Sequence, residues 1–272
     1  MTKIKLIAID LDETLLDDKK QISEANIKAI RKAHEQGIKI VISSGRPEIG
    51  IKAVLNKLGL LGADTYFIAY NGTRVYYEKT NTLLYEKYLT GKDIKDIYKV
   101  LPNNLFMHFY DANCKLFATA RNPYTDFGAR VNNIDYEIID PNTLPDDGKF
   151  IKLLFTGDPQ YVDEIIKKIP TYYYERFSPT RSAPIFFEFL AKGVSKGDAL
   201  TYLINYLGLK QNEVCAMGDN DNDYEMLEVA GKKIAMENSL SKKVLDIATF
   251  ITKSNNNSGV AYAIEKILNE EI

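Results

Sequence analysis

Apolar runs alternate with a helical pattern along the first part of the chain. Residues 4–9 form an apolar run rich in Ile, which is typical of a buried strand in a parallel sheet. Residues 23–36 then show apolar positions at helical spacing, with Ser23 placed to cap the helix and Gly37 placed to end it. A second apolar run at 38–42 completes a strand, helix, strand unit, which predicts parallel strands.

The middle of the chain has a different pattern. Short strand candidates rich in aromatic residues lie between residues 85 and 187, separated by helical patterns near 93–100 and 160–169. The final third returns to alternating helices and strands. We therefore predict an α/β protein, with a Rossmann-like parallel-sheet core made of residues 1–84 and 188–272 and an inserted α+β cap domain over residues 85–187.

Polar residues follow the predicted core strands where each strand ends. Asp10 and Asp12 follow the first strand, Ser44 follows the second, and Asp219 follows a strand predicted at 214–217. Residues two apart on extended backbone point to one side, so the first two carboxylates can address one substrate. Because ligands of open parallel sheets bind beyond the carboxyl ends of the strands, these residues should meet in one crevice. Crowded carboxylates repel, which predicts a positive charge among them.

Composition narrows the class of ligand. The chain has 272 residues and a formal net charge of −2, which gives no electrostatic reason to expect nucleic acid or an anionic membrane as a partner. No apolar stretch approaches the roughly 20 residues that span a bilayer. The opening residues Met1-Thr2-Lys3 lead into a strand rather than a signal peptide, so we expect a cytoplasmic protein. A small ligand is the default expectation, and no obligate protein partner is evident.

Cysteine and histidine add no competing site. Cys114 and Cys215 lack metal-type spacing, so we expect buried reduced thiols. His34 and His108 have no partner at metal or triad spacing and are expected to be structural. The chain contains neither a P-loop nor a dinucleotide-binding glycine pattern.

Four ordered motifs carry a family resemblance. They are Asp10-Leu11-Asp12-Glu13-Thr14, Ser44-Gly45-Arg46, Ser195-Lys196-Gly197-Asp198 and Gly218-Asp219-Asn220-Asp221-Asn222-Asp223. In this order they resemble the motifs of the haloacid dehalogenase-like hydrolases. The insertion between the second and third motifs resembles the Cof-type subfamily, class IIB, which has a large α/β cap and includes sugar phosphatases.

The resemblance implies a Mg²⁺-dependent phosphatase. Asp10 would be the nucleophile that forms an aspartyl phosphate. Asp12 would act as general acid and base, which suits a carboxyl of raised pKa, and would give its backbone carbonyl to the metal. Asp10 and Asp219 would be the side-chain metal ligands. Asp223 resembles the outer carboxylate of the family, either a ligand or a partner of the ligands.

Further residues would bind the phosphate group. The resemblance assigns this role to Ser44, Gly45, Arg46, Lys196 and Asn222. Ser43 remains an alternative to Ser44, and a salt bridge at a helix start is an equally fair interpretation of Arg46. Asn71, in Asn71-Gly72-Thr73, either lines the cleft or shapes a hairpin turn.

Two features of the acidic residues limit this picture. Asp219, Asp221 and Asp223 alternate as in a calcium-binding EF-hand, but Tyr224 and Ala230 stand where that loop needs Gly and a bidentate Glu. Asp221 is therefore expected to be solvated. Glu237 departs from the family pattern, in which Gly often precedes the residue equivalent to Asn238, and this leaves the role of Asn238 open.

The substrate class implied by the resemblance is a small phosphorylated metabolite, with sugar phosphates leading. Flavin mononucleotide and pyridoxal phosphate are alternatives, because specificity depends on cap residues that the sequence does not place. A phosphosugar mutase would use the same phosphoaspartate. A non-catalytic sugar-phosphate sensor is a further alternative, against which the intact pair of Asp10 and Asp12 argues.

Overall fold

The computed structural model describes residues 3–272, which form two compact units. The first unit contains the chain up to Glu86 and Ser195–Ile272, and the second contains Lys87–Val194. Met1 and Thr2 lie outside the described residues. The expectation that they lead into the first strand therefore concerns a part of the chain that the structure does not describe. In the described part of the chain, no helix has both the length and the apolar character needed to cross a bilayer.

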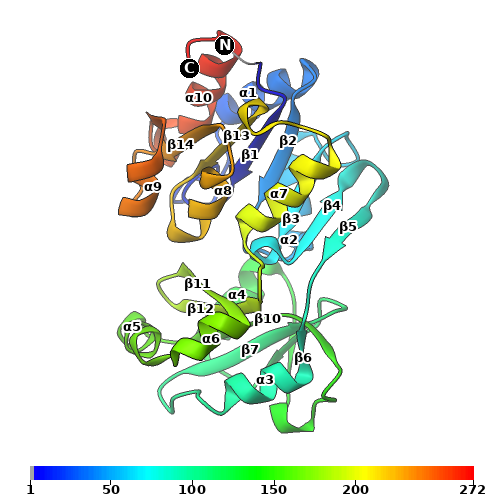
Figure 1. The fold of residues 1–272 in the computed structure, drawn as a ribbon, viewed down its shortest axis with the longest axis vertical. Coiled ribbons are helices and arrows are strands. Elements are labelled where there is room, and N and C mark those ends of the chain that lie inside the picture. Colours follow the sequence, from blue (N-terminus) through cyan, green and yellow to red (C-terminus); the bar gives the residue numbers. More distant parts are fainter. Residues whose placement is uncertain (1–2) are drawn as a thin grey trace. The chain divides into compact units, whose positions relative to one another are not determined.

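The first unit is built on an eight-stranded sheet with the order β15-β14-β13-β1-β2-β3-β4-β5 (Figure 1). The strands from β15 to β3 pair in parallel, and β4 and β5 add an antiparallel edge. Their bounds are β1 Leu6–Asp10, β2 Lys39–Ser43, β3 Tyr66–Ala69, β4 Arg74–Tyr77, β5 Thr82–Glu86, β13 Val214–Gly218, β14 Lys232–Met236 and β15 Phe250–Thr252. The predicted parallel core is confirmed.

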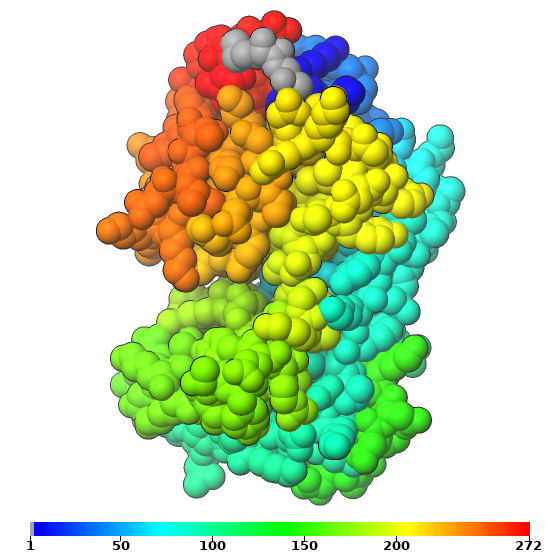
Figure 2. Space-filling view, in the orientation of Figure 1, coloured from blue at the N-terminus to red at the C-terminus, as the bar shows by residue number. Residues whose placement is uncertain are grey.

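Helices cover both faces of this sheet. They are α1 Glu24–Glu35, α2 Glu48–Leu58, α7 Lys196–Tyr206, α8 Tyr224–Glu228, α9 Lys242–Ile247 and α10 Gly259–Leu268. Short 3₁₀ turns lie at Tyr70–Gly72, Glu78–Thr80, Gln211–Glu213, Asp221–Asp223 and Asn255–Asn257. The first and last helices lie side by side (Figure 1), and the backbone N–H of Ala261 donates to Asn26 Oδ1 at 2.9 Å. Figure 2 shows blue N-terminal and red C-terminal segments at the same end of the first unit.

Alternating strand residues divide the core between the two sheet faces. Leu6, Ala8 and Val41 pack in one cluster with Ala199 of α7 and Met226 of α8. The capping chemistry predicted for α1 is also present, because Ser23 Oγ accepts from the backbone N–H of Asn26. The contacts in this cluster pack β1 and β2 against α7 and α8.

The second unit is an α+β domain whose mixed sheet has the order β11-β12-β10-β7-β8-β9, with β6 also paired to β10. All pairs are antiparallel except β8 with β9. The strands are β6 Leu89–Thr90, β7 Phe106–Asp111, β8 Leu116–Ala118, β9 Tyr136–Ile138, β10 Lys149–Thr156, β11 Phe177–Ala183 and β12 Phe186–Ala191. The helices are α3 Gly91–Tyr98, α4 Pro123–Asn132, α5 Pro159–Lys168 and α6 Thr171–Arg176, with a 3₁₀ turn at Pro141–Thr143.

The boundaries of the second unit differ from those drawn from the sequence. The chain leaves the first unit after Glu86 and returns at Ser195, whereas the sequence suggested residues 85 and 187 as the limits of the insertion. A boundary at 187 falls inside β12, whose pairing with β10 and β11 keeps it in the second sheet.

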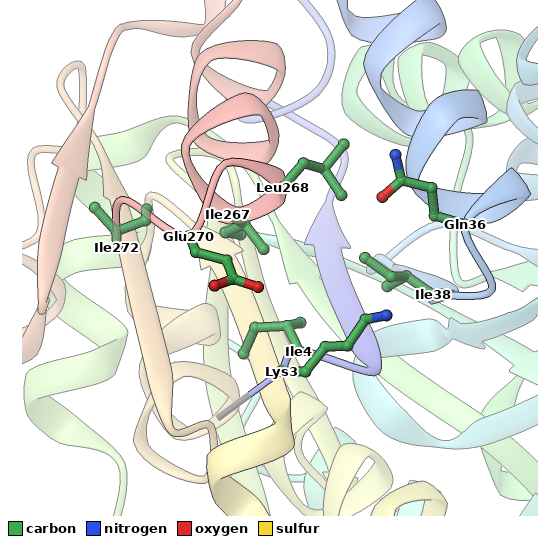
Figure 3. Close-up of a pocket in the computed structure, with 8 residues that line it drawn as sticks. All are labelled: Lys3, Ile4, Gln36, Ile38, Ile267, Leu268, Glu270 and Ile272. Carbon is green, nitrogen blue, oxygen red and sulfur yellow. The ribbon is translucent and has the colours of Figure 1, made fainter. Parts of the chain in front are cut away.

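A pocket in the first unit lies at the opposite end of the strands from the predicted crevice (Figure 3). Ile4 and Ile38 precede β1 and β2, and both line this pocket with Ile267 of α10. The strand ends at Asp10 and Ser43 are on the far side of the sheet's length. The pocket therefore shares no residue with the candidate site.

Candidate active site

The centre of the site is a buried lysine between two carboxylates. Lys196 opens helix α7, and its Nζ lies 2.5 Å from Asp10 Oδ1 and 2.6 Å from Asp223 Oδ1. All three residues are buried, and Lys196 is only 1% exposed. Burial lowers the pKa of Lys196, but the charges of Asp10 and Asp223 outweigh burial and raise the pKa above its usual value. The lysine is therefore held in its charged form, as the crowded carboxylates predicted.

Asp10 is the last residue of β1, beside Ser43 of β2 in the parallel register. Burial raises the pKa of Asp10 well above its usual value, and repulsion from Asp223 raises it further, against the opposing effect of Lys196. The charge of Lys196 thus does not offset the combined effect of burial and of Asp223 on the pKa of Asp10.

Asp219 and Asp223 complete an acidic cluster at the end of β13. One carboxylate oxygen from each of Asp10, Asp219 and Asp223 lies within 4.8 Å of the others. Burial raises the pKa of Asp219 to about 7, with a further contribution from the charge of Asp223, although Thr14 donates a hydrogen bond to Asp219 Oδ1 at 2.6 Å. This cluster is a group of carboxylates that could hold a metal ion.

Asp223 already has partners on both of its oxygens. Its Oδ1 accepts from Lys196, and its Oδ2 accepts from the backbone N–H groups of Asp219 and Asn220 at 3.0 and 3.1 Å. Gly218 permits this fold of the loop, because a Cβ at that position would lie 2.5 Å from Asp223 Cβ. These bonds orient Asp219 and Lys196 whether or not Asp223 itself binds a cation.

The donor set fits a hard divalent cation. All the side chains offered are oxygen ligands, which suits Mg²⁺ better than a softer metal. Three carboxylates, those of Asp10, Asp219 and Asp223, gather at the single ammonium group of Lys196, so the cluster carries more negative charge than Lys196 neutralises when all three are ionised. A bound cation would supply the missing positive charge and stabilise negative charge on a phosphoryl group.

Asp12 does not join this cluster through its side chain. The strand ends at Asp10, and the turn that follows gives Glu13 a left-handed backbone with φ of 63°. The Asp12 carboxylate instead accepts two hydrogen bonds from Arg46, at 2.9 and 2.7 Å, and lies 3.2 Å from Lys20 Nζ.

The pKa of Asp12 is shifted in the direction opposite to the one expected for a general acid. Burial raises the pKa of Asp12, but the hydrogen bonds and charge of Arg46, aided by Lys20, outweigh burial and hold the pKa below its usual value. The expectation of a raised pKa is wrong for this state. The salt-bridge interpretation of Arg46 is the one that the structure shows.

The segment after β2 brings two serines close to the site. Ser43 pairs with Asp10, and its buried Oγ has no partner among the described residues. Ser44 Oγ accepts from the backbone N–H of Arg46 at 3.1 Å, which leaves the hydroxyl hydrogen of Ser44 able to donate. Both serines remain candidates for binding phosphate.

Residues from two further strand ends also reach the site. Asn71, in the 3₁₀ turn after β3, accepts a hydrogen bond from Asn222 Nδ2 at 3.1 Å. After β14, Asn238 Nδ2 donates to the backbone carbonyl of Glu13 at 2.8 Å, and Ser239 Oγ donates to the carbonyl of Asp219 at 2.5 Å. The sequence left Asn71 and Asn238 open and did not indicate Ser239. The only available signal was their position just beyond strands.

The remaining predictions concern residues outside the cluster. Asp221 is exposed, as expected, but its carboxylate accepts a hydrogen bond from Ser241. His34 and His108 each contact a structural partner, the carbonyl of Asp64 and the hydroxyl of Thr125. Cys215 is buried, whereas the expectation of burial is wrong for Cys114, which is half-buried in a turn after β7.

Comparison with known proteins identifies the family of this chain. The family model of the haloacid dehalogenase-like hydrolases matches residues 7–264. The chain is 37% identical over 267 residues to the putative phosphatase YxeH of Bacillus subtilis (strain 168), covering 97% of this chain and 98% of that protein. It is 32% identical over 293 residues to the 5-amino-6-(5-phospho-D-ribitylamino)uracil phosphatase YwtE of the same organism, covering 97% and 98% of the two chains.

A solved structure shares the fold across both units. The crystal structure of a haloacid dehalogenase-like hydrolase from Bacteroides thetaiotaomicron superposes with a TM-score of 0.84 at 32% identity, covering 97% of this chain and 100% of that chain. The inserted mixed sheet is the cap that the resemblance to the Cof-type subfamily implied. The chain therefore belongs to the haloacid dehalogenase-like hydrolases and is a phosphatase, a hydrolase of phosphoric monoesters.

Proposed function

We propose that this phosphatase is Mg²⁺-dependent, hydrolyses sugar phosphates, and transfers the phosphoryl group through Asp10. The observation that carries the proposal is the cluster in which Lys196 holds Asp10 beside Asp219 and Asp223. Asp10 and Asp219 would hold the cation, with the backbone carbonyl of Asp12 and, as a ligand or a partner, Asp223. The cation would supply positive charge to the phosphoryl group.

The reaction proceeds in two steps at phosphorus. A carboxylate oxygen of Asp10 bonds to phosphorus as the bond from phosphorus to the sugar oxygen breaks, and Asp12 gives its proton to that oxygen. Asp12 then takes a proton from water, whose oxygen attacks phosphorus and releases inorganic phosphate from Asp10. Lys196 neutralises charge on Asp10 and on the phosphoryl oxygens.

Asp12 needs a change of partner for the first step. In the described state Arg46 binds both oxygens of Asp12, which suits the ionised base of the second step but not the acid of the first. A phosphate group competes for the guanidinium, because Arg binds phosphate oxygens as readily as carboxylates. Binding of substrate would thereby release Asp12 to take up a proton. Ser44, Gly45 and Asn222 would donate further hydrogen bonds to phosphate.

Sugar phosphates lead the substrate class for two reasons. The cap of a Cof-type chain resembles those of sugar phosphatases, and one relative at 32% identity acts on a molecule that carries a 5-phospho-D-ribityl group. A phosphorylated polyol and a phosphorylated sugar present the same phosphate ester next to hydroxyl groups. Both belong on the test panel.

The test is a phosphate-release assay across a panel of metabolites with Mg²⁺. The panel holds hexose and pentose phosphates, ribitol 5-phosphate, flavin mononucleotide and pyridoxal phosphate, each without a bisphosphate activator. We expect turnover of sugar or polyol phosphates by the wild type, and a loss of about 10³-fold or more in Asp10→Asn. Preferred hydrolysis of flavin mononucleotide or pyridoxal phosphate would change the substrate class. A requirement for bisphosphate would indicate a mutase, and binding without turnover a sensor.

A further inference from the structure

Asn71 occupies an unusual position for a turn residue. It follows β3 in the 3₁₀ turn Tyr70–Gly72, with a left-handed backbone of φ 56° and ψ 33°, and it is only 1% exposed. Glycine adopts this left-handed conformation at no steric cost, and it has no side-chain amide that would have to be buried. The described structure leaves Asn71 Nδ2 buried with no hydrogen-bond partner. A turn alone does not account for this side chain.

The contacts of Asn71 reach two segments with proposed phosphate-binding residues. Its backbone N–H donates to the carbonyl of Ser44 at 3.0 Å, and its Oδ1 accepts from Asn222 Nδ2 at 3.1 Å. Its side chain also lies against Gly45, where an added Cβ would come within 3.0 Å of Asn71 Nδ2. Asn71 therefore joins the end of β2 to the loop after β13.

The same turn is packed against the start of helix α7. Gly72 has φ of 103°, and a Cβ there would lie 2.0 Å from the carbonyl oxygen of Ser195. The backbone N–H of Tyr70 donates to the carbonyl of Arg46 at 3.1 Å. The position of Asn71 is thus fixed from several sides, so its Oδ1 is a rigid acceptor rather than a mobile one.

A rigid acceptor controls which end of the Asn222 amide meets a ligand. The oxygen and nitrogen ends of an amide have nearly the same shape, but only the nitrogen end donates to a phosphate oxygen. An acceptor that holds one N–H of Asn222 fixes the orientation of the whole amide group. The second N–H of the same nitrogen then stays available as a donor.

We infer that Asn71 is a positioning residue of the phosphate site, which acts by holding the Asn222 amide with its nitrogen available to the phosphate group. This inference rests on the proposed function of Asn222 as a phosphate donor. It goes beyond that function by giving the turn after β3 a defined part in anion binding. Asn71 acts through Asn222 and need not touch substrate.

A double-mutant cycle tests this dependence. The variants are Asn71→Gly, which suits the left-handed backbone, Asn222→Ala, and the two combined. Affinity for inorganic phosphate in the presence of Mg²⁺ is measured by calorimetry, and kcat and KM are measured with the best substrate. Asn81→Gly is the matched control, because Asn81 has φ of 53° but is exposed in the turn after β4.

We expect Asn71→Gly and Asn222→Ala each to weaken phosphate binding by about tenfold to a hundredfold, the size of one hydrogen bond to a charged group. In the Asn222→Ala background, Asn71→Gly should cause no further loss. The thermal midpoint of Asn71→Gly should match that of Asn81→Gly. Independent effects that multiply in the double variant, or unchanged phosphate affinity in Asn71→Gly, would overturn the inference.

The calorimetric measurement of phosphate affinity distinguishes failure of this inference from failure of the proposed function. If the wild type binds phosphate but hydrolyses no ester, the proposed function fails while coupling between Asn71 and Asn222 still decides the inference. If the wild type hydrolyses esters but the two residues act independently, the inference fails alone. If the wild type neither binds phosphate nor turns over an ester, both are overturned.

Discussion

Two buried lysines show how the same residue type serves different purposes in this molecule. Lys152 forms an ion pair with Glu188 at 3.0 Å within the cap sheet. Lys196 contacts Asp10 and Asp223 in a cluster that also contains Asp219, so negative charge exceeds positive charge there. Buried ion pairs are weak evidence for stability by themselves. The cluster of carboxylates around Lys196 instead could hold a metal ion.

The buried His108 provides a pH-dependence test at the residue scale. Burial lowers the pKa of His108 to about 3, with a further contribution from the charge of Lys152. The unfolded chain takes up a proton near pH 6.5, whereas the folded chain does not until about pH 3. The free energy of unfolding should therefore fall as the pH drops through this window, by up to about 1.4 kcal/mol per pH unit.

Urea unfolding of wild type and His108→Gln from pH 7.5 to pH 4.5 measures this contribution. The wild type should be the more stable at pH 7.5, and its advantage should shrink by roughly 3 kcal/mol by pH 4.5, since only the wild type gains a proton on unfolding at this position. A difference between the two proteins that stays constant with pH would contradict the assignment.

The sequence indicated the charged residues of the site better than it indicated the contacts of the residues around them. The resemblance to the family motifs named Asp10, Asp219 and Lys196. Their positions support the assignment, because a carboxylate at a strand end and a lysine at a helix start are unusual unless an anion or a cation is bound. The pairing of Asp12 with Arg46 could not be predicted, because it depends on the turn at Glu13. The amide contact of Asn71 joins residues 151 positions apart and has no sequence signal.

At the scale of elements, periodicity predicted the helices that have one buried face. Helix α1 begins after Ser23 and ends before Gly37, which has φ of 84°. Helix α6 was not predicted, because the run Tyr172-Tyr173-Tyr174 has no helical periodicity in the sequence. In the structure Tyr173 is buried, whereas Tyr172 and Tyr174 are exposed. Helix α4 was also missed, since Phe127 and Val131 are exposed and obscure its apolar face.

Two helix glycines give a matched test of element packing. A Cβ at Gly197, in the first turn of α7, would lie 2.6 Å from the backbone of Glu225 in α8. A Cβ at Gly128, within α4, would meet only the ring of Phe186 at 3.7 Å. Gly197→Ala should cost about 1–3 kcal/mol through overpacking, whereas Gly128→Ala should stabilise by about 0.5–1 kcal/mol.

Thermal unfolding of the two alanine variants and the wild type checks this prediction. The midpoint should fall for Gly197→Ala and rise slightly for Gly128→Ala. A midpoint for Gly197→Ala at or above that of the wild type would show that α7 and α8 are not in the close contact described.

At the scale of the whole molecule, one sheet assembles residues from both ends of the sequence. Strand β1 lies between β2 and β13, although 203 residues lie between the end of β1 at Asp10 and the start of β13 at Val214. The sequence predicted a split core because α/β alternation stops and resumes. It misplaced the limits of the insertion, because strand β12 is as apolar as a core strand.

The candidate metal ligands come from the ends of separate strands and meet only in the folded chain. We therefore predict that Mg²⁺ stabilises the fold. A cation that binds only the folded chain adds about 2.7 kcal/mol at one hundred times its dissociation constant, which corresponds to a rise of about 5 °C or more in thermal midpoint. Asp219→Asn should lose most of this rise. Asp221→Asn, an exposed residue of the same loop, should keep it.

The stabilisation by Mg²⁺ should also depend on pH. Because burial, with the charge of Asp223, raises the pKa of Asp219 to about 7, a proton competes with the cation below that pH. The rise in midpoint should therefore be larger at pH 8 than at pH 6. An equal rise in wild type and Asp219→Asn, or full activity after exhaustive chelation, would contradict the metal assignment.

The central claim is that Asp10 carries the phosphoryl group, and trapping that intermediate tests it most directly. Asp12→Asn is mixed with ³²P-labelled p-nitrophenyl phosphate and Mg²⁺ and then quenched in acid. Nitrophenolate leaves without a proton, while the step that needs Asp12 as base is slow. We predict label on the peptide that contains Asp10 and none in a variant that also carries Asp10→Asn. Label on another residue, or phosphate release by Asp10→Asn at the wild-type rate, would contradict the account.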